Sequence, residues 1–172
     1  MTMNLRIEGL RAQLNNARYV LSDIPDTILT AETPVKGYGT IGEQFRHLIN
    51  YVQILLRDFD KGVFNFNDRE RNVALETDKA AIDRMLVDLH DRVGAFLDKD
   101  PDTSLRSIFI PLTHKPPVED GKTLGDAINY VSDHSYHHTA AIKLLAHIQG
   151  VQIGSDGGVA PATEVHRKYQ AV

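Results

Sequence analysis

The stretch from Thr123 to Ile148 constrains the fold more than any other part of this sequence. Thr123 and Asp126 have the spacing of a capping box, with Asp in the place of the usual Glu, and no Pro interrupts the residues that follow. On a helical wheel with about 100° per residue, one sector holds the apolar side chains Leu124, Ala127, Ile128, Val131, Ala141, Ile142 and Leu145. His134 and His138 fall near the middle of the same sector. The pattern predicts a long helix with two imidazoles on its buried face.

A metal ion is the leading explanation for these two imidazoles. Residues four apart on a helix lie above one another, with Cβ atoms roughly 5–6 Å apart. His134 and His138 can therefore converge on one ion at about 2.0–2.1 Å from each nitrogen. A metal also removes the cost of burying an imidazole without a partner, because it takes the nitrogen lone pair. His137 lies about 90° from the centre of the sector and fits less well. The alternative is that these are histidines at the edge of the core, hydrogen-bonded to neighbouring helices.

Three further segments have the apolar periodicity of amphipathic helices: residues 4–24, 40–60 and 77–97. Thr40 with Glu43 forms a capping-box signal for the second segment, and Thr77 is the expected cap of the third. Residues 105–112 have alternating and β-branched character, which indicates a short strand or hairpin before the last helix. We therefore expect an all-α four-helix bundle, with any metal or ligand site in its core.

Residues 61–74 have no helical period and are interpreted as irregular. Phe64 and Phe66 alternate with polar residues, and the charged run from Asp68 to Arg71 follows. Such a run is typical of a solvated loop. The alternative is a loop folded over a pocket, with the phenylalanines facing inward and an arginine in contact with an anionic group of a substrate.

Length and composition limit the domain organisation and the partners. The chain has 172 residues, enough for one domain with a sizeable core, so we expect a single domain over residues 1–172. Its Gly- and Pro-rich end, residues 151–172, indicates an extended tail. The net charge of -4 argues against a nucleic-acid surface, because phosphate binding needs clustered Lys and Arg. The absence of cysteine excludes disulfides and thiolate ligands and fits a cytoplasmic location. The sequence has no signal-peptide pattern and no apolar run of about 18 residues, so we expect no membrane partner.

His47 carries no signal of its own. It lies on the second predicted helix but well off its main apolar stripe, so periodicity alone makes it a flank residue. Its surroundings are more informative. GEQFRH, from Gly42 to His47, and HSYHH, from His134 to His138, resemble the helix-two and helix-four motifs of the DinB/YfiT-like family of metal-dependent enzymes.

The resemblance covers most of the chain and implies a helical bundle with a divalent metal ion. FNDRER from Phe66 and GVAPAT from Gly158 are similar to sequences in an uncharacterised branch of this family. The family pattern implies that His47, His134 and His138 bind the ion, usually zinc or nickel, and that water fills the open positions. Family members transfer low-molecular-weight thiols, isomerise thiol adducts or hydrolyse small molecules, and they often form homodimers.

Two departures limit what the resemblance implies. The Glu that usually follows the first histidine of the helix-four motif is Ser135 here, which removes the general base of an HExxH zinc protease. The chain also has no Glu-x-x-His, which argues against a diiron bundle. Asp68, Arg69 and Arg71 are candidates for contacts to a small-molecule substrate, and no catalytic acid or base can be assigned.

Three hypotheses of different classes follow. The first is an enzyme with an open three-histidine metal site, in which thiol transfer ranks slightly ahead of hydrolysis because of the family. The second is a metal-binding sensor or scaffold with closed coordination and no turnover. The third is a bundle without metal that acts through a dimer face, with the imidazoles paired to backbone carbonyls or to Glu43, Asp58 and Asp133.

Overall fold

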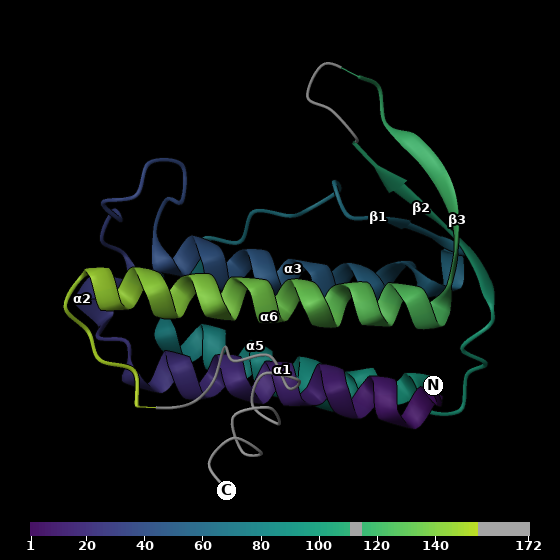
Figure 1. Ribbon diagram of the computed structural model, residues 1–172, viewed down its shortest axis with the longest axis horizontal. Coiled ribbons are helices and arrows are strands. Elements are labelled where there is room, and N and C mark those ends of the chain that lie inside the picture. Colours follow the sequence, from purple (N-terminus) through teal and green to yellow (C-terminus); the bar gives the residue numbers. More distant parts are fainter. Residues whose placement is uncertain (111–114, 155–172) are drawn as a thin grey trace, which may run out of the picture.

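The computed structural model describes residues 1–110 and 115–154 (Figure 1). The helices of this part are α1 Met3–Asp23, α2 Asp26–Leu29, α3 Ile41–Asp58, α4 Ala74–Thr77, α5 Lys79–Arg92 and α6 Leu124–Ile148. The strands are β1 Val63–Asn65, β2 Ser104–Phe109 and β3 Val118–Thr123. Short 3₁₀ turns extend α3 over Phe59–Lys61 and α5 over Val93–Phe96. The expected helical class is thus confirmed, with a small sheet added to it.

Two capping boxes begin the helices that carry the histidines. At the start of α3, the Glu43 amide donates to Thr40 Oγ1 at 3.1 Å, and the Thr40 amide donates to a carboxylate oxygen of Glu43 at 2.9 Å. At the start of α6, Thr123 and Asp126 exchange the same pair of hydrogen bonds at 3.1 and 3.3 Å. Each box satisfies amides that have no partner inside the helix. Both predicted boxes are confirmed.

The expected cap of the third long helix was wrong by one residue. Thr77 ends α4, and its hydroxyl donates to the carbonyl of Val73. Asp78 begins α5 instead, since its carboxylate accepts hydrogen bonds from the amides of Ala80 and Ala81 at 2.9 and 3.1 Å. An ionised carboxylate is the stronger acceptor at the positive end of a helix.

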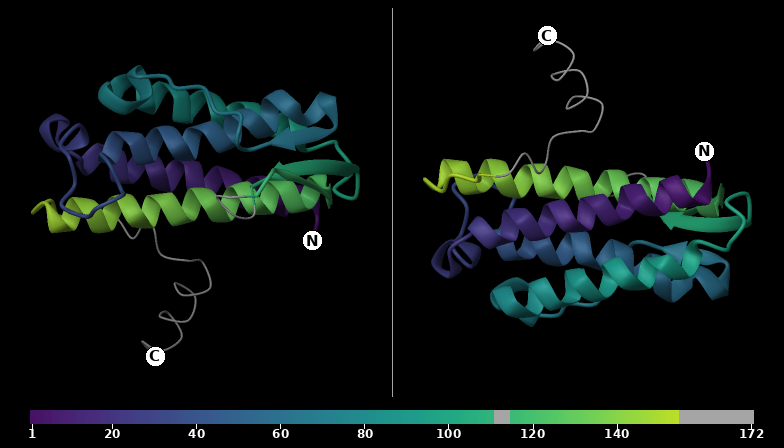
Figure 2. Two further views of the ribbon diagram at one scale, coloured as in Figure 1. Left: turned by 90° about the horizontal axis from the view of Figure 1, so that it is seen from above. Right: turned by 90° about the horizontal axis from the view of Figure 1, so that it is seen from below.

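The four long helices lie side by side (Figures 1 and 2). Helix α6 packs against α1 and α3, and α5 packs against the same two helices from the other side. Their facing surfaces are apolar. Fully buried side chains include Ile7, Leu10, Leu14, Phe45, Leu48, Leu86, Leu89, Ile128 and Ile142. Helices α3 and α6 run in opposite directions, so the first turns of α3 face the second half of α6 (Figure 1).

The sheet is larger than the predicted hairpin. Strand β2 pairs antiparallel with β3 and parallel with β1, in the order β1-β2-β3. The interpretation of residues 61–74 as irregular was therefore wrong for β1, Val63–Asn65. A parallel partner some 40 residues along the chain cannot be read from a local pattern. Phe64 and Phe66 are buried, which agrees with the alternative of an inward-facing segment.

The end of α6 is tied back to the end of α1. Val151 and Ile153 pack against the core, and the Gly154 amide donates to a carboxylate oxygen of Asp23 at 2.9 Å. The rest of the expected tail, residues 155–172 with the GVAPAT motif, lies outside the described residues, as do residues 111–114. No helix in the described ranges is long and apolar enough to cross a membrane.

Candidate metal centre

Three histidines meet between α3 and α6. The ring centroid of His47 lies 4.4 Å from that of His138 and 5.1 Å from that of His134. The two rings on α6 are 4.5 Å apart, with their Nε2 atoms separated by 3.1 Å. One nitrogen from each ring can be chosen so that all three lie within 4.8 Å of one another. The structure therefore brings together the three residues that the family motif indicated.

The position of His47 follows from how α3 packs. The apolar stripe of α3 is fully buried. Tyr51, one turn after His47 and off this stripe, is buried as well, with only 9% of its surface exposed. The Tyr51 ring stacks on His134 at 3.7 Å between centroids. Helix α3 thus buries a second face against α6, and His47 lies on it. A single-helix periodicity identifies the dominant face and misses such a second contact.

The donor atoms fit a divalent ion. His138 Nδ1 lies 2.8 Å from Gln44 Oε1, an oxygen that can only accept, so this ring nitrogen carries the proton. The Gln44 amide group is itself oriented, because its Nε2 donates to the Tyr38 carbonyl at 2.6 Å. The lone pair of His138 Nε2 is left facing His134 Nε2. Their 3.1 Å separation is close to the roughly 3.3 Å between two nitrogens at tetrahedral corners with bonds of about 2.0–2.1 Å.

All three imidazoles are held neutral. Burial lowers the pKa of His47 to about 3, with a further contribution from the positive charge of Arg69. Burial lowers the pKa of His138 to about 3, and the neighbouring imidazoles add to this. Burial, with the charges of His137 and Arg69, lowers the pKa of His134 to about 4. A neutral imidazole keeps one unprotonated nitrogen with a lone pair, which is the form that binds a metal.

The imidazoles do not use the carboxylates that the metal-free hypothesis proposed. Glu43 serves the capping box, and Asp58 accepts hydrogen bonds from Arg57 and Lys61. Among the described residues, the hydrogen bonds of the three imidazoles go to Gln44, to Arg69 and to one another. The carboxylates named by the metal-free hypothesis are therefore not among these partners, and the binding of a metal ion stays a prediction.

Of the three candidates for substrate contacts, one reaches the cluster. Arg69 Nη1 lies 2.6 Å from His47 Nδ1 and 3.2 Å from its Nε2. Asp68 points elsewhere and pairs with Arg57 at 3.2 Å. Arg71 pairs with the buried carboxylate of Glu76 at 3.2 Å. A contact of any of the three with a substrate stays a prediction, and the geometry favours Arg69.

Sequence reasoning missed Gln44, which orients His138. Nothing in the helical pattern distinguishes it from other polar residues on α3. We expect Gln44→Leu to lower metal affinity about 10–100-fold, since the His138 ring loses the partner that fixes its tautomer and orientation. Competition with a chromophoric chelator measures this affinity. Gln53→Leu, on the same helix and away from the histidines, serves as the matched control, and an equal loss in both variants would contradict the assignment.

The neutral histidines also predict a dependence of stability on pH. An unfolded chain binds protons at histidine with a pKa near 6.5, whereas folded His138 has a pKa of about 3. The unfolded state therefore binds more protons between these values, and the free energy of unfolding falls as the pH is lowered through this range. For buried His138 we expect a loss of about 1–2 kcal/mol between about pH 7 and pH 5.

Thermal melts of chelator-treated protein at the two pH values test this dependence. His138→Gln has no imidazole at this position, so its melting temperature changes less with pH than that of the wild type. Equal changes in both proteins would show that His138 is not held neutral by the fold.

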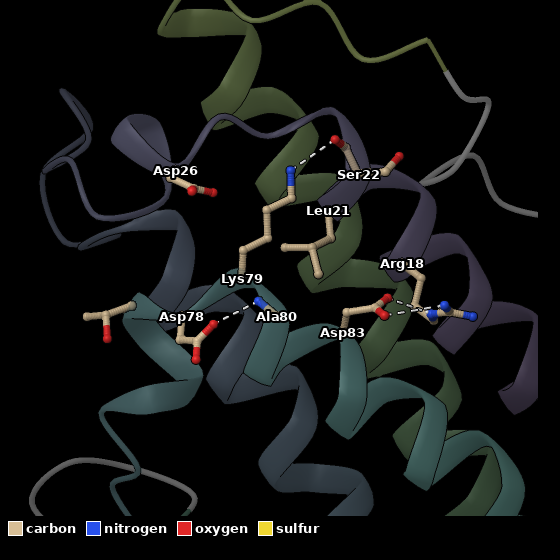
Figure 3. A pocket seen from close by; sticks show the side chains of 9 residues that line it. Arg18, Leu21, Ser22, Asp26, Asp78, Lys79, Ala80 and Asp83 are labelled. Carbon is tan, nitrogen blue, oxygen red and sulfur yellow. Dashed lines mark hydrogen bonds and ion pairs between the residues drawn. The ribbon is translucent and has the colours of Figure 1, made fainter.

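Apart from the histidine cluster, an open cavity of about 690 Å³ lies at the junction of α1, α2 and the start of α5 (Figure 3). Several of its charged groups already have partners. Arg18 pairs with Asp83 at 2.8 Å, and Lys79 donates to the carbonyls of Ser22 and Ile24. None of the described residues that line it is a histidine. These contacts tie α5 to the end of α1, so we read this cavity as structural.

The packed helices of this chain bring three neutral histidines together. This arrangement defines a class of helical proteins that could hold a divalent metal ion. A family model described as the DinB superfamily matches residues 10–142, a span that includes all three histidines. The chain belongs to the DinB superfamily. It is also similar to the protein named "FK506-binding protein 5" of Rhizopus delemar, with 28% identity over 109 residues. That alignment covers 63% of this chain but 28% of the relative, so the chain corresponds to a minor part of that protein.

Proposed function

We propose that this protein is a metal-dependent enzyme that acts on a small molecule, with transfer of a low-molecular-weight thiol ahead of hydrolysis as the reaction. The observation that carries the proposal is the convergence of three neutral imidazoles within 4.8 Å. His47, His134 and His138 would hold the ion, with zinc and nickel as the leading candidates by family. A bound ion of this kind supplies Lewis acidity, which lowers the pKa of a bound water or stabilises a thiolate.

The surrounding residues support a site that is open to a substrate. Three imidazoles leave at least one position of a tetrahedral ion without a protein ligand. Arg69, against His47, has no carboxylate partner among the described residues and can bind an anionic group of a substrate. The stacked rings of Tyr51 and Phe66, 5.0 Å apart, keep water from one side of the histidines.

Cobalt substitution tests whether the site is open. Protein loaded with Co²⁺ is titrated with 2-mercaptoethanol and its absorption spectrum is followed. We expect a new thiolate-to-cobalt charge-transfer band that is absent in His134→Ala. A spectrum typical of four protein ligands, unchanged by the thiol, would favour the scaffold hypothesis. Failure to bind Co²⁺, Zn²⁺ or Ni²⁺ would reject both metal hypotheses.

We also propose that the protein is a single-domain four-helix bundle that forms a homodimer in the cytoplasm. The packing of the four long helices supports the family's four-helix bundle, formed as one domain over residues 1–172. Exposed apolar side chains on the outer faces of α1 and α6 support the homodimer that is frequent in the family: Leu5, Tyr19, Leu144 and Ile148. A cytoplasmic location agrees with the absence of cysteine.

A further inference from the structure

A cavity beside the histidines has the character of a ligand site. Its volume is about 380 Å³, within the range of roughly 300–1,000 Å³ found for small-molecule sites. It is lined by side chains of the β2–β3 hairpin, of α3 and of the first turns of α6, whose arrangement Figure 1 shows. Residues of five segments line it, among them Tyr51, Phe66, Ser107, Phe109, Asp120 and Tyr130.

Three aromatic rings form one wall of this cavity. Tyr51 and Phe66 stack at 5.0 Å, and the Tyr130 ring lies 5.3 Å from Phe66 and 6.0 Å from Tyr51. Tyr51 and Phe66 are buried, but Tyr130 is 44% exposed. At the other side, Phe109 and Ile110 are also exposed. Apolar surface that stays exposed around a concave site marks a place where a partner removes it from water.

The same rings connect the cavity to the histidines. Tyr51 stacks on His134 at 3.7 Å, and the Tyr130 ring lies 5.9 Å from it. A flat group stacked on Tyr130 therefore lies close to His134, the nearest member of the three-histidine cluster. Arg69, in contact with His47 of this cluster, offers a guanidinium to a negative charge.

We propose that this cavity binds the ring-bearing part of a small aromatic anion whose charged end lies at the histidines and Arg69. This assignment rests on the proposed function and adds the class of substrate to it. Aromatic walls favour a flat ring through stacked and edge-to-face contacts. The buried Ser107 hydroxyl and the side chains of Asn67 and Lys122 supply polar contacts at the edges.

Three probes separate the parts of this proposal when their binding to zinc-loaded protein is measured by calorimetry. 2-Naphthoate carries a ring and a charge, acetate carries the charge alone, and naphthalene-2-carboxamide carries the ring alone. We expect 2-naphthoate to bind at least about tenfold more tightly than acetate, because only its ring fills the aromatic cavity. Equal affinities for these two probes would overturn the assignment.

Variants locate the binding. Tyr130→Ser is expected to weaken both naphthalene probes about fivefold, with unchanged zinc content and no effect on acetate. Phe109→Ser, another exposed position, is a second variant with the same expectation. Tyr19→Ser, on the outer face of α1, is the matched control and leaves all three affinities unchanged. Arg69→Gln weakens 2-naphthoate and spares the carboxamide.

The two proposals can fail separately. If the protein binds no metal but the carboxamide still binds in a Tyr130-dependent manner, the metal function is rejected and the aromatic cavity is retained. If zinc binds at one equivalent while neither Tyr130→Ser nor Phe109→Ser changes the affinity for any probe, the cavity is rejected and the metal site is retained.

Discussion

In the His138→Ala variant, we expect bound metal to fall from about one equivalent to near zero, whereas His137→Ala should retain it. The two positions are adjacent on α6 and carry the same side chain, so they differ mainly in the direction in which each side chain projects from the helix. His138 is buried and its Nε2 lies 3.1 Å from that of His134. The His137 ring is 6.4 Å from that of His134 and lies outside the three-histidine cluster.

The effect is large because one of only three protein ligands is removed. Loss of a residue that merely orients a ligand costs about 10–100-fold in affinity, so loss of the ligand itself exceeds that. Mass spectrometry of protein purified without a histidine tag and loaded with zinc or nickel gives the metal content. Circular dichroism verifies that both variants remain helical. Metal loss in both variants, or in neither, would refute the assignment of His138.

The sequence was most informative where the controlling interactions are local. Thr40 with Glu43 and Thr123 with Asp126 act within one helical turn, and both boxes form as predicted. The pairing of His134 with His138 is also local, because residues four apart on one helix must lie over one another. These features could be predicted without knowing how the helices pack.

The remaining parts of the site depend on contacts between distant segments. His47 is off the main stripe of α3, and only the family motif indicated it. Gln44 reaches His138 across 94 positions of sequence, and no pattern within α3 identifies it. Strand β1 forms because β2 offers a parallel edge much later in the chain. Arg69 was among three charged candidates in one run, and only the fold shows which one faces the histidines.

Gly42→Ala is expected to destabilise the protein by about 2–3 kcal/mol, near the upper end of the usual cost of overpacking. A Cβ atom at this position would meet the main chain of Glu76 on α4, with the carbonyl carbon at 2.6 Å. Main-chain atoms cannot rotate away, so α3 and α4 must separate. In a chain of this size, such a loss lowers the melting temperature by about 5–10 °C. Thermal unfolding followed by circular dichroism measures it.

Gly125→Ala is the matched control because it occupies the equivalent place in α6, two residues after the capping threonine. Its added Cβ would meet only the guanidinium end of Arg6, at 2.8 Å, and a flexible side chain can move aside. Ala is favoured over Gly in a helix by about 1 kcal/mol, so this variant should be as stable as the wild type or slightly more so. Equal destabilisation of the two variants would mean that glycine is required by the capping box and not by α4.

If contact with α4 is the cause, we expect Gly42→Ala to weaken metal binding as well. Glu76 of α4 pairs with Arg46 at 2.7 Å, and Arg46 directly precedes His47.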